Sequence, residues 1–372
     1  MAKVTRQRRG AAAASCESAK RKRQSVRTGA EEVTLLEGDC FEVLAGLDAE
    51  SVDAIITDPP YGIGFQSARW DSGAIRDTAA RAGEDRLSPN QAFEVWARLW
   101  ATECARVLKP GAFLLAFGSP RTFHRLACGI EDSGLEIRDT LMWLYGEGMS
   151  KSRHYPGGRS TTLKPAFEPI VVARRALDGT TGETIYRHGT GALNAEACKV
   201  EGRHPANVVL EHDPGCGEGG CAPGCTAAAV DACVAEGRSH SGSRIAPSRF
   251  LYCPKARRDE RDAGCERLPL RALDLFPDAG HGGDSRNPHP CVKPLELMRW
   301  LVRLACPPGG VVLDPTCGSG STGAACVLEG RRFVGIELER AYLEISAARI
   351  AHWSPKGVRK PRVRRAPLGR RR

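Results

Sequence analysis

The sequence predicts an α/β protein with a mostly parallel, doubly wound sheet. Three observations predict this fold class. A β-branched apolar run at 52–56 indicates a fully buried strand. Apolar side chains at helical spacing over 91–108 lead into a second buried run at 112–117, and the same alternation returns over 310–351. Strands that alternate with helices favour parallel pairing, because each parallel connection needs a crossover.

The remaining elements follow from the same patterns in chain order. Further strands are expected at 33–36, 138–145, 168–173, 310–313 and 333–336, and further helices before 52, near 120–133, and at 294–306, 321–329 and 340–351. From about 176 to 286, Gly, Pro, Cys, His and Arg replace the periodic pattern, which predicts an irregular insertion. The expected division is 30–175 for the first half of the domain, 176–286 for the insertion and 287–353 for the second half.

Length and cysteine content limit the class of protein. The 372 residues allow one large core with an insertion, or two modest domains. No stretch reaches the roughly 18 to 20 apolar residues of a membrane span, and the N-terminus shows no apolar region typical of a secretory signal. We therefore expect a cytoplasmic protein. The 15 cysteines, an odd number scattered through the chain, favour reduced thiols over a disulfide framework.

Positive charge is concentrated at the two ends of the chain. The net charge is +10, yet residues 1–29 hold nine Lys or Arg against Glu17 alone, and residues 355–372 hold nine and no acid. The body between them is therefore acidic, and segments 1–29 and 354–372 are expected to be disordered basic tails. Such tails commonly bind polyanions, so nucleic-acid contact is favoured over a solvated tail or, for the N-terminus, an organelle-targeting peptide.

A rigid polar corner follows the strand at 52–56, in the stretch TDPPYG at 57–62. Asp58 lies at the carboxyl end of that strand, where open α/β sheets bind ligands. Pro59 and Pro60 fix φ and lack an N–H, so nearby carbonyl groups are free to accept hydrogen bonds. Tyr61 adds a flat aromatic face. The corner suits a planar ligand with an NH₂ group, such as a nucleobase, and the alternative is an Asp-Pro turn with a core tyrosine.

A second candidate site is the glycine loop LDPTCGSGST at 313–322. Gly318 and Gly320 allow a tight turn at the start of a helix. Glu337 ends the following strand, where an acid can bind both hydroxyl groups of a ribose. The loop has neither a lysine nor the G-x-G-x-x-G spacing of a phosphate site, so a nucleoside without phosphate is favoured. The alternative is a glycine turn needed for packing alone.

Taken together, these motifs resemble the S-adenosylmethionine-dependent DNA amino-methyltransferases, the N6-adenine/N4-cytosine family. The resemblance rests on Asp39 in GDC, on 57–62, on LKPGAFLLAFGS, on HPCVKPLELMRWLVRL, and on 314–337. It implies a class I, Rossmann-like methyltransferase fold. The order, with the catalytic half first and the cofactor half last, is similar to that of the circularly permuted subgroup. In that subgroup the target-recognition segment lies between the two halves.

The resemblance implies direct methyl transfer to adenine N6 of a base flipped out of double-stranded DNA, without a covalent intermediate. Asp58 and the Pro59 carbonyl would accept the N–H bonds of the amine, Pro60 would stiffen the corner, and Tyr61 would stack on the base. The expected cofactor residues are Asp39 for adenine, Glu337 for ribose, the loop of Asp314, Pro315, Thr316, Gly318 and Gly320 for the methionine part, and Lys293 with the following helix for its carboxylate.

Several alternatives stay open. Thr316 stands where the family usually has Phe, which removes a ring beside the cofactor. An acid before the two prolines goes more often with adenine, and the alternatives are an N4-cytosine enzyme and a non-catalytic DNA-binding relative. A nucleotide-binding oxidoreductase would leave the DPPY corner unexplained. A homodimer and a cognate restriction endonuclease are further partners that the resemblance allows. Trp143 is expected either behind the base pocket or in the core.

The insertion also contains a candidate metal site. His212, Cys216, Cys221 and Cys225 follow one another as H-x₃-C-x₄-C-x₃-C in a glycine-rich segment. Four such ligands within fourteen residues resemble a small structural zinc site, although the spacing differs from a C-x₂-C knuckle. Cys233 or Cys253 could replace one member. The alternative is a set of reduced cysteines in a flexible loop.

Overall fold

The computed structural model describes residues 32–65, 68–84, 86–145, 154–200, 202–211, 216, 221–223, 225, 227–229, 251–272, 284–355 and 361–365. The predicted basic arm at 1–29 lies outside these residues, as does most of the C-terminal tail. Within the described part of the chain, no helix is long and apolar enough to cross a membrane.

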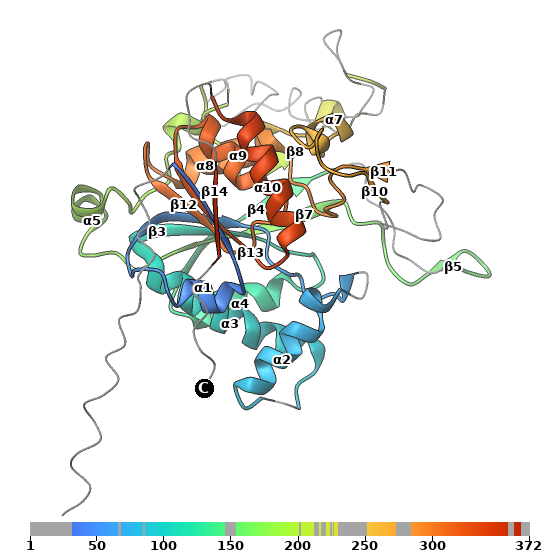
Figure 1. The fold of residues 1–372 in the computed structure, drawn as a ribbon, viewed down its shortest axis with the longest axis horizontal. Coiled ribbons are helices and arrows are strands. Elements are labelled where there is room, and N and C mark those ends of the chain that lie inside the picture. Colours follow the sequence, from blue (N-terminus) through green and yellow to red (C-terminus); the bar gives the residue numbers. More distant parts are fainter. Residues whose placement is uncertain are drawn as a thin grey trace, which may run out of the picture.

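A ten-stranded sheet forms the centre of the protein (Figure 1). Its spatial order is β14 (Arg362–Arg365), β1 (Val33–Glu37), β13 (Arg332–Glu337), β12 (Val311–Asp314), β2 (Val52–Thr57), β3 (Leu108–Phe117), β7 (Phe167–Arg174), β4 (Glu136–Leu144), β8 (Val208–Leu210) and β9 (Leu251–Tyr252). Only β7 runs antiparallel to its neighbours, β3 and β4. The predicted mostly parallel α/β sheet is therefore confirmed.

Helices cover both faces of the sheet, as a doubly wound fold requires (Figure 1). One face carries α8 (Leu295–Ala305), α9 (Ser321–Leu328) and α10 (Arg340–Trp353), and the other carries α1 (Cys40–Leu44), α2 (Gly73–Arg81), α3 (Pro89–Val107) and α4 (Phe123–Asp132). Strand β3 serves both layers, because Leu115 packs in the first cluster and Leu114 in the second. Both faces of the central strands are thus buried, which explains their continuous apolar sequences.

The longest helix, α3, shows how local sequence sets these boundaries. Ser88 and Gln91 form a capping box, and Pro89 occupies the first turn, where its missing N–H costs nothing. Trp96 and Trp100 lie one turn apart on the buried face and stack with ring centroids 5.7 Å apart. The helix is therefore fixed at its start by hydrogen bonds and along its length by aromatic packing.

The insertion at 176–286 is more regular than the sequence predicts. It contains α5 (Thr181–His188), η3 (Glu196–Cys198), α7 (Arg258–Asp262) and the pairs of β10 (Arg271–Ala272) with β11 (Asp284–Ser285). Strands β8 and β9 also belong to it, and they extend the main sheet beyond β4. The sequence pattern did not indicate these elements, and strands of two or three residues are too short to show an alternating pattern.

The C-terminal tail at 354–372 is also not fully disordered. Strand β14 pairs in parallel with β1, with Arg362 opposite Thr34. The prediction is wrong for these four residues, because the edge of β1 offers unpaired backbone groups that bind any nearby extended segment. Basic side chains on an edge strand are compatible with solvent.

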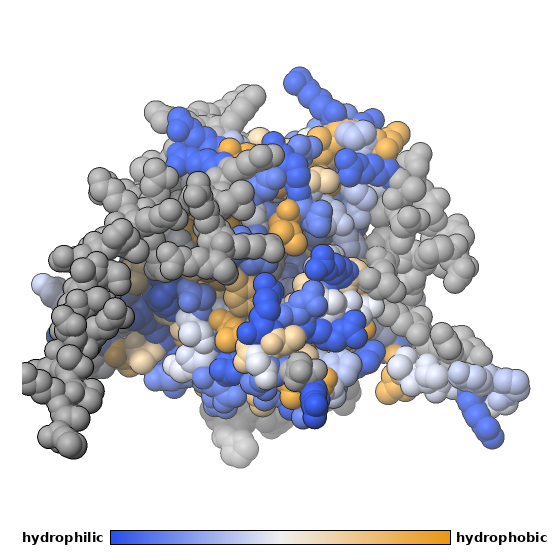
Figure 2. Space-filling view, turned by 60° about the horizontal axis from the view of Figure 1, so that its bottom comes forward, coloured by the Kyte–Doolittle hydropathy of each residue, from blue (hydrophilic) through white to orange (hydrophobic). Residues whose placement is uncertain are grey.

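The short pair of β5 (His154–Tyr155) and β6 (Arg159–Ser160) extends from the body between β4 and β7 (Figure 1). On the face in Figure 2, hydrophilic residues cover most of the described surface, and hydrophobic residues lie between them in small groups. Scattered apolar residues of this kind are normal for a protein surface.

Candidate active site

Two neighbouring strands bring the two predicted sites together. Strands β2 and β12 are parallel partners, with Leu313 opposite Ile55, so both end at the same edge of the sheet. Thr57 Oγ1 donates a hydrogen bond to Asp314 Oδ1 over 2.7 Å. Thr316 Oγ1 lies 2.7 Å from Thr57 Oγ1 and 3.2 Å from the Asp58 carbonyl oxygen. The TDPPYG corner and the glycine loop are thereby joined, and Thr316 has a polar role that phenylalanine could not fill.

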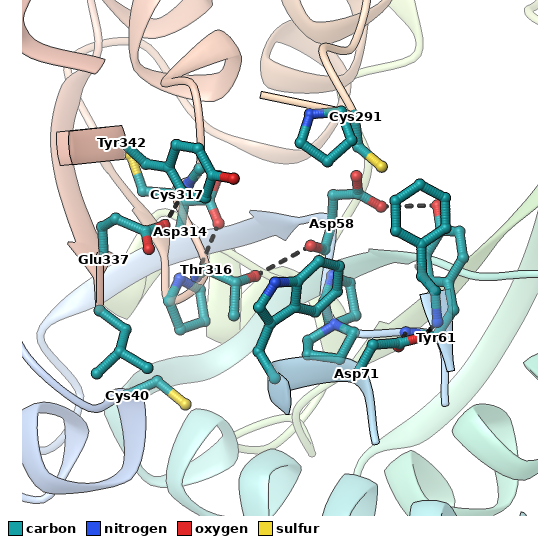
Figure 3. A pocket seen from close by; sticks show the side chains of 18 of the residues that line it. Cys40, Asp58, Tyr61, Asp71, Cys291, Asp314, Thr316, Cys317, Glu337 and Tyr342 are labelled. Atoms are coloured by element: carbon teal, nitrogen blue, oxygen red, sulfur yellow. Dashed lines mark hydrogen bonds between the residues drawn. The ribbon is translucent and has the colours of Figure 1, made fainter. Parts of the chain in front are cut away.

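One cavity of about 440 Å³ spans both motifs. Nearly all the residues predicted for the catalytic and cofactor sites line it: Asp39, Asp58, Pro59, Pro60, Tyr61, Lys293, Asp314, Pro315, Thr316, Gly318 and Glu337. Glu337 and Tyr342 lie toward one end, and Asp58 and Tyr61 toward the other (Figure 3). The cavity can therefore hold two groups at once, one at each end.

Gly320 is the predicted residue that does not line the cavity. Its φ is +76°, and a Cβ there would lie 2.4 Å from Ser346 Oγ and 2.9 Å from Ser346 Cα. Glycine is thus required for the packing of α9 against α10. Gly318, with φ +53°, does face the cavity, and a Cβ there would lie 2.7 Å from His289 Nε2. In the same turn, Gly318 therefore lines the cavity and Gly320 allows the two helices to pack.

Asp58 lies in a buried polar group at one end of the cavity. Tyr61 donates its hydroxyl hydrogen bond to Asp58 Oδ1 over 2.7 Å, and Lys293 Nζ lies 2.6 Å from Asp58 Oδ2. Burial raises the pKa of Asp58, and the charge of Lys293 opposes this rise. Burial alone would lower the pKa of Lys293, but the charges of Asp58 and Glu168 outweigh it, so the pKa is raised and the ammonium stays protonated.

Lys293 therefore lies in an ion pair that the sequence did not predict. The sequence placed Lys293 beside the carboxylate of the cofactor's methionine part, which the N-terminus of the following helix was also expected to bind. That helix, α8, begins at Leu295, whose N–H donates to Glu260 Oε1 over 2.6 Å. The chain's own Glu260 thus occupies the helix N-terminus, and Lys293 Nζ contacts carboxylates at the Asp58 end of the cavity.

The opposite end of the cavity is organised around Glu337. Its Oε2 accepts a hydrogen bond from the Gly318 N–H and its Oε1 accepts one from the Glu339 N–H, both over 2.8 Å. Burial raises the pKa of Glu337 to about 7. Asp39 lines the same cavity and accepts hydrogen bonds from the N–H groups of Phe41 and Glu42, so it caps α1.

Asp314 fixes the glycine loop through hydrogen bonds to residues of the loop and of α9. Besides Thr57, it accepts hydrogen bonds from the Thr316 N–H and from Thr322 Oγ1, the latter over 2.6 Å. Burial raises the pKa of Asp314 to about 6. With both of its oxygens engaged, this carboxylate shapes the turn between β12 and α9.

Two acidic residues of the site were missed by sequence reasoning. Asp71, in the short helix η2 (Arg69–Asp71), is 1% exposed and accepts hydrogen bonds from four backbone N–H groups of the TDPPYG corner and the residues after it: Tyr61, Gly62, Ile63 and Phe65. Glu168, on β7, approaches Lys293 Nζ to 3.2 Å. No motif marks either residue, because both reach the corner through the fold.

Trp143 belongs to the core. It is 2% exposed, and its indole Nε1 donates to the Cys253 carbonyl over 2.9 Å. It does not line the cavity described above. Of the two interpretations given for this tryptophan, the packing one therefore agrees with the structure.

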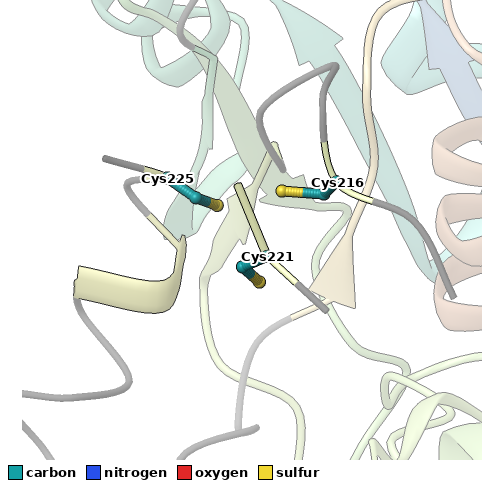
Figure 4. Close-up of side chains that lie close together, drawn as sticks. All are labelled: Cys216, Cys221 and Cys225. Carbon is teal, nitrogen blue, oxygen red and sulfur yellow. The ribbon is translucent and has the colours of Figure 1, made fainter. Parts of the chain in front are cut away.

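Three of the four predicted metal ligands lie close together, outside the cavity. The sulfur atoms of Cys216, Cys221 and Cys225 are within 4.8 Å of one another (Figure 4). The Ala222 N–H donates a hydrogen bond to Cys216 Sγ over 3.2 Å. The fourth predicted ligand, His212, lies outside the described residues.

Comparison with known proteins identifies the family. A family model described as DNA methylase matches residues 52–348. The chain belongs to this DNA methylase family, which transfers methyl groups to exocyclic N6 or N4 nitrogens. The predicted membership of the DNA amino-methyltransferase family is thereby confirmed. The permuted order of the two halves stays a prediction.

Individual members of the DNA methylase family match most of the chain. The DNA adenine methyltransferase YhdJ of Escherichia coli K12 is 25% identical over 348 residues, 92% of each chain. The type II methyltransferase M.HindIII of Haemophilus influenzae is 24% identical, covering 82% of this chain and 90% of its own. The structure of the cytosine-N4-specific PvuII DNA methyltransferase aligns with a TM-score of 0.52 at 14% identity, over 90% of this chain and 93% of that one, which supports the fold.

The contacts of Asp71 generate a stability prediction. Asp71→Asn should lower the free energy of unfolding by about 1–3 kcal/mol, because the amide NH₂ would face backbone N–H donors in place of an acceptor. Urea unfolding measures this change. Asp77→Asn on α2, an exposed partner of Arg69, is the matched control and should change stability by less than about 0.5 kcal/mol. Equal stability of the two variants would contradict this role of Asp71.

Proposed function

We propose that this protein transfers a methyl group from S-adenosylmethionine to N6 of adenine in double-stranded DNA. The observation that carries the proposal is the single cavity that holds Asp58 and the adjacent Pro59 at one end and Glu337 with the glycine loop at the other. A nucleoside cofactor fits the second end, where a carboxylate and a close backbone approach are available. The name of YhdJ, an adenine methyltransferase, supports the choice of base.

The residues at the corner would act on the amine by orientation and electrostatics. The lone pair of an exocyclic amine is delocalised into the ring, so the amine is a poor nucleophile. Asp58 and the Pro59 carbonyl accept its two N–H bonds, and this favours a pyramidal nitrogen with its lone pair directed into the cavity. When bound, S-adenosylmethionine supplies an electrophilic methyl group on a sulfonium. The methylated nitrogen then loses a proton, for which Asp58 is the adjacent acceptor.

Other residues would bind the cofactor, the flipped base and the DNA. Glu337 would bind the ribose hydroxyls, Asp39 the adenine end, and the turn from Asp314 to Gly318 the methionine part. Tyr61 would stack on the flipped base, with its ring held in place by the hydrogen bond to Asp58. The insertion at 176–286 would recognise the target sequence, and the basic tails would contact phosphates.

Transfer to N4 of cytosine is the second candidate, because the family includes such enzymes and the PvuII enzyme shares the fold. The acidic residue before Pro59 favours adenine over cytosine.

Asp58→Ala tests the proposal. The variant should lose at least about a hundredfold in methyl transfer, because one of the two acceptors of the amine is removed, while its Kd for S-adenosylmethionine should change by less than about threefold. Transfer of labelled methyl to unmethylated DNA measures the rate of the variant. Mass analysis of DNA methylated by the wild-type protein should show N6-methyladenine.

Asp132→Ala, at an exposed position of α4, is the control and should keep full activity. Methylated cytosine in the product would favour the second candidate. Full activity of Asp58→Ala, or an equal loss of cofactor binding, would contradict the assignment of Asp58.

We also propose that Cys216, Cys221 and Cys225 bind a structural zinc ion, with His212 as the fourth ligand. Sulfur atoms around zinc lie about 3.8 Å apart when each Zn–S bond is about 2.3 Å, so cysteines whose sulfur atoms already lie within 4.8 Å need little movement. Four protein ligands would leave no open position, so the metal would order the insertion and take no part in the reaction.

Metal analysis tests the zinc site. Protein purified without chelator should contain about one zinc per chain, and the Cys221→Ser, Cys225→Ser double variant should contain none. Cys128→Ser, at an exposed cysteine of α4, should retain the metal. A metal-free wild-type protein with full sequence-specific activity would contradict the proposal.

A further inference from the structure

The ammonium group of Lys293 is enclosed by two carboxylates and two aromatic rings. Its Nζ lies 2.6 Å from Asp58 Oδ2 and 3.2 Å from Glu168 Oε2. It is also 3.3 Å from the Tyr61 hydroxyl oxygen and 4.9 Å from the centroid of the Phe117 ring. These side chains come from segments that are far apart in the sequence: the corner after β2, the start of β7 and the loop before α8. We call Asp58, Glu168, Lys293 and Tyr61 the acidic cluster.

The charges of the acidic cluster do not cancel. Two carboxylates share one ammonium, so the cluster carries a net charge of about −1 when all three groups are ionised. The exposed fractions of the side chains are 8% for Lys293, 20% for Asp58 and 19% for Glu168. Screening by water is weak at this degree of burial, so an uncompensated charge acts strongly on a group bound beside it.

Other ionisable groups line the same cavity. Burial, and to a lesser extent the charge of Asp58, raise the pKa of Asp314, which adds negative charge near the cluster when it is ionised. Lys255 Nζ lies 3.8 Å from the centroid of the Tyr145 ring, and its backbone N–H donates to Glu211 Oε1. Lys255 and Glu211 thus add one charge of each sign nearby. Burial, and next the charge of Glu168, raise the pKa of Tyr145, so this phenol stays neutral.

We propose that Glu168 is a positioning residue for methyl transfer, because it shares the ammonium of Lys293 with Asp58. A lysine paired with Asp58 alone would neutralise that carboxylate and weaken it as an acceptor for the N–H of the base. With its charge divided between two carboxylates, Lys293 orients Asp58 and leaves the cluster negative. A negative cluster stabilises the positive charge that develops on the amine nitrogen as its bond to the methyl carbon forms.

This inference rests on the proposed function, and single-turnover methylation of unmethylated DNA at saturating S-adenosylmethionine tests it. Glu168→Gln keeps the size of the side chain and should slow the reaction at least about tenfold. Its Kd values for cofactor and DNA should stay within about twofold of the wild-type values, which also shows that the variant is folded. Glu131→Gln, the same change at an exposed position of α4, should have no effect.

A second variant at the same position separates charge sharing from packing. Glu168→Asp keeps the carboxylate but shortens the side chain, so it should react faster than Glu168→Gln. A packing role predicts the opposite order, because glutamine preserves the size of the side chain and aspartate does not.

Three results would overturn the inference: a wild-type rate for Glu168→Gln, a loss of ligand binding as large as the loss of rate, or a rate for Glu168→Asp below that of Glu168→Gln. A wild-type protein that transfers no methyl group would instead contradict the proposed function itself, and with it this inference.

Discussion

The hydrogen bonds between the ends of β2 and β12 are the interaction on which the site depends. Thr57 donates to Asp314, and Thr316 reaches both Thr57 and the carbonyl of Asp58. These contacts join the corner that would bind the base to the loop that would bind the cofactor, although the two motifs lie far apart in the sequence. Direct transfer between two bound groups needs this fixed separation, since small misplacements of reacting atoms are costly.

The cavity carries several carboxyl groups whose burial is unfavourable. Burial raises the pKa of Asp314 to about 6 and that of Glu337 to about 7, while Lys293 partly compensates the charge of Asp58. The surrounding backbone N–H groups and hydroxyls hold these carboxyl groups in place. A ligand with hydroxyl and amine donors would complete their hydrogen bonding, which is consistent with a nucleoside at one end and a nucleobase amine at the other.

The sequence predicted the parts of the fold and site that depend on local pattern. The apolar runs of the central strands, the apolar spacing of the long helices and the residues of the DPPY corner and glycine loop are all visible in short stretches. Other features were not predicted: the pairing of β14 with β1, the short strands of the insertion, and the contacts of Asp71, Glu168 and Lys293. Each of these depends on segments brought together by the folded sheet, and no periodicity or motif marks such contacts in advance.

The structure of the protein with bound S-adenosylmethionine is the most direct test of the claim that one cavity joins both partners of the reaction. The account predicts the ribose hydroxyls on Glu337, the methionine part along the turn from Asp314 to Gly318, and the sulfonium methyl group directed at Asp58 and the Pro59 carbonyl. A cofactor bound outside this cavity, or bound within it with its methyl group directed away from Asp58, would contradict the account.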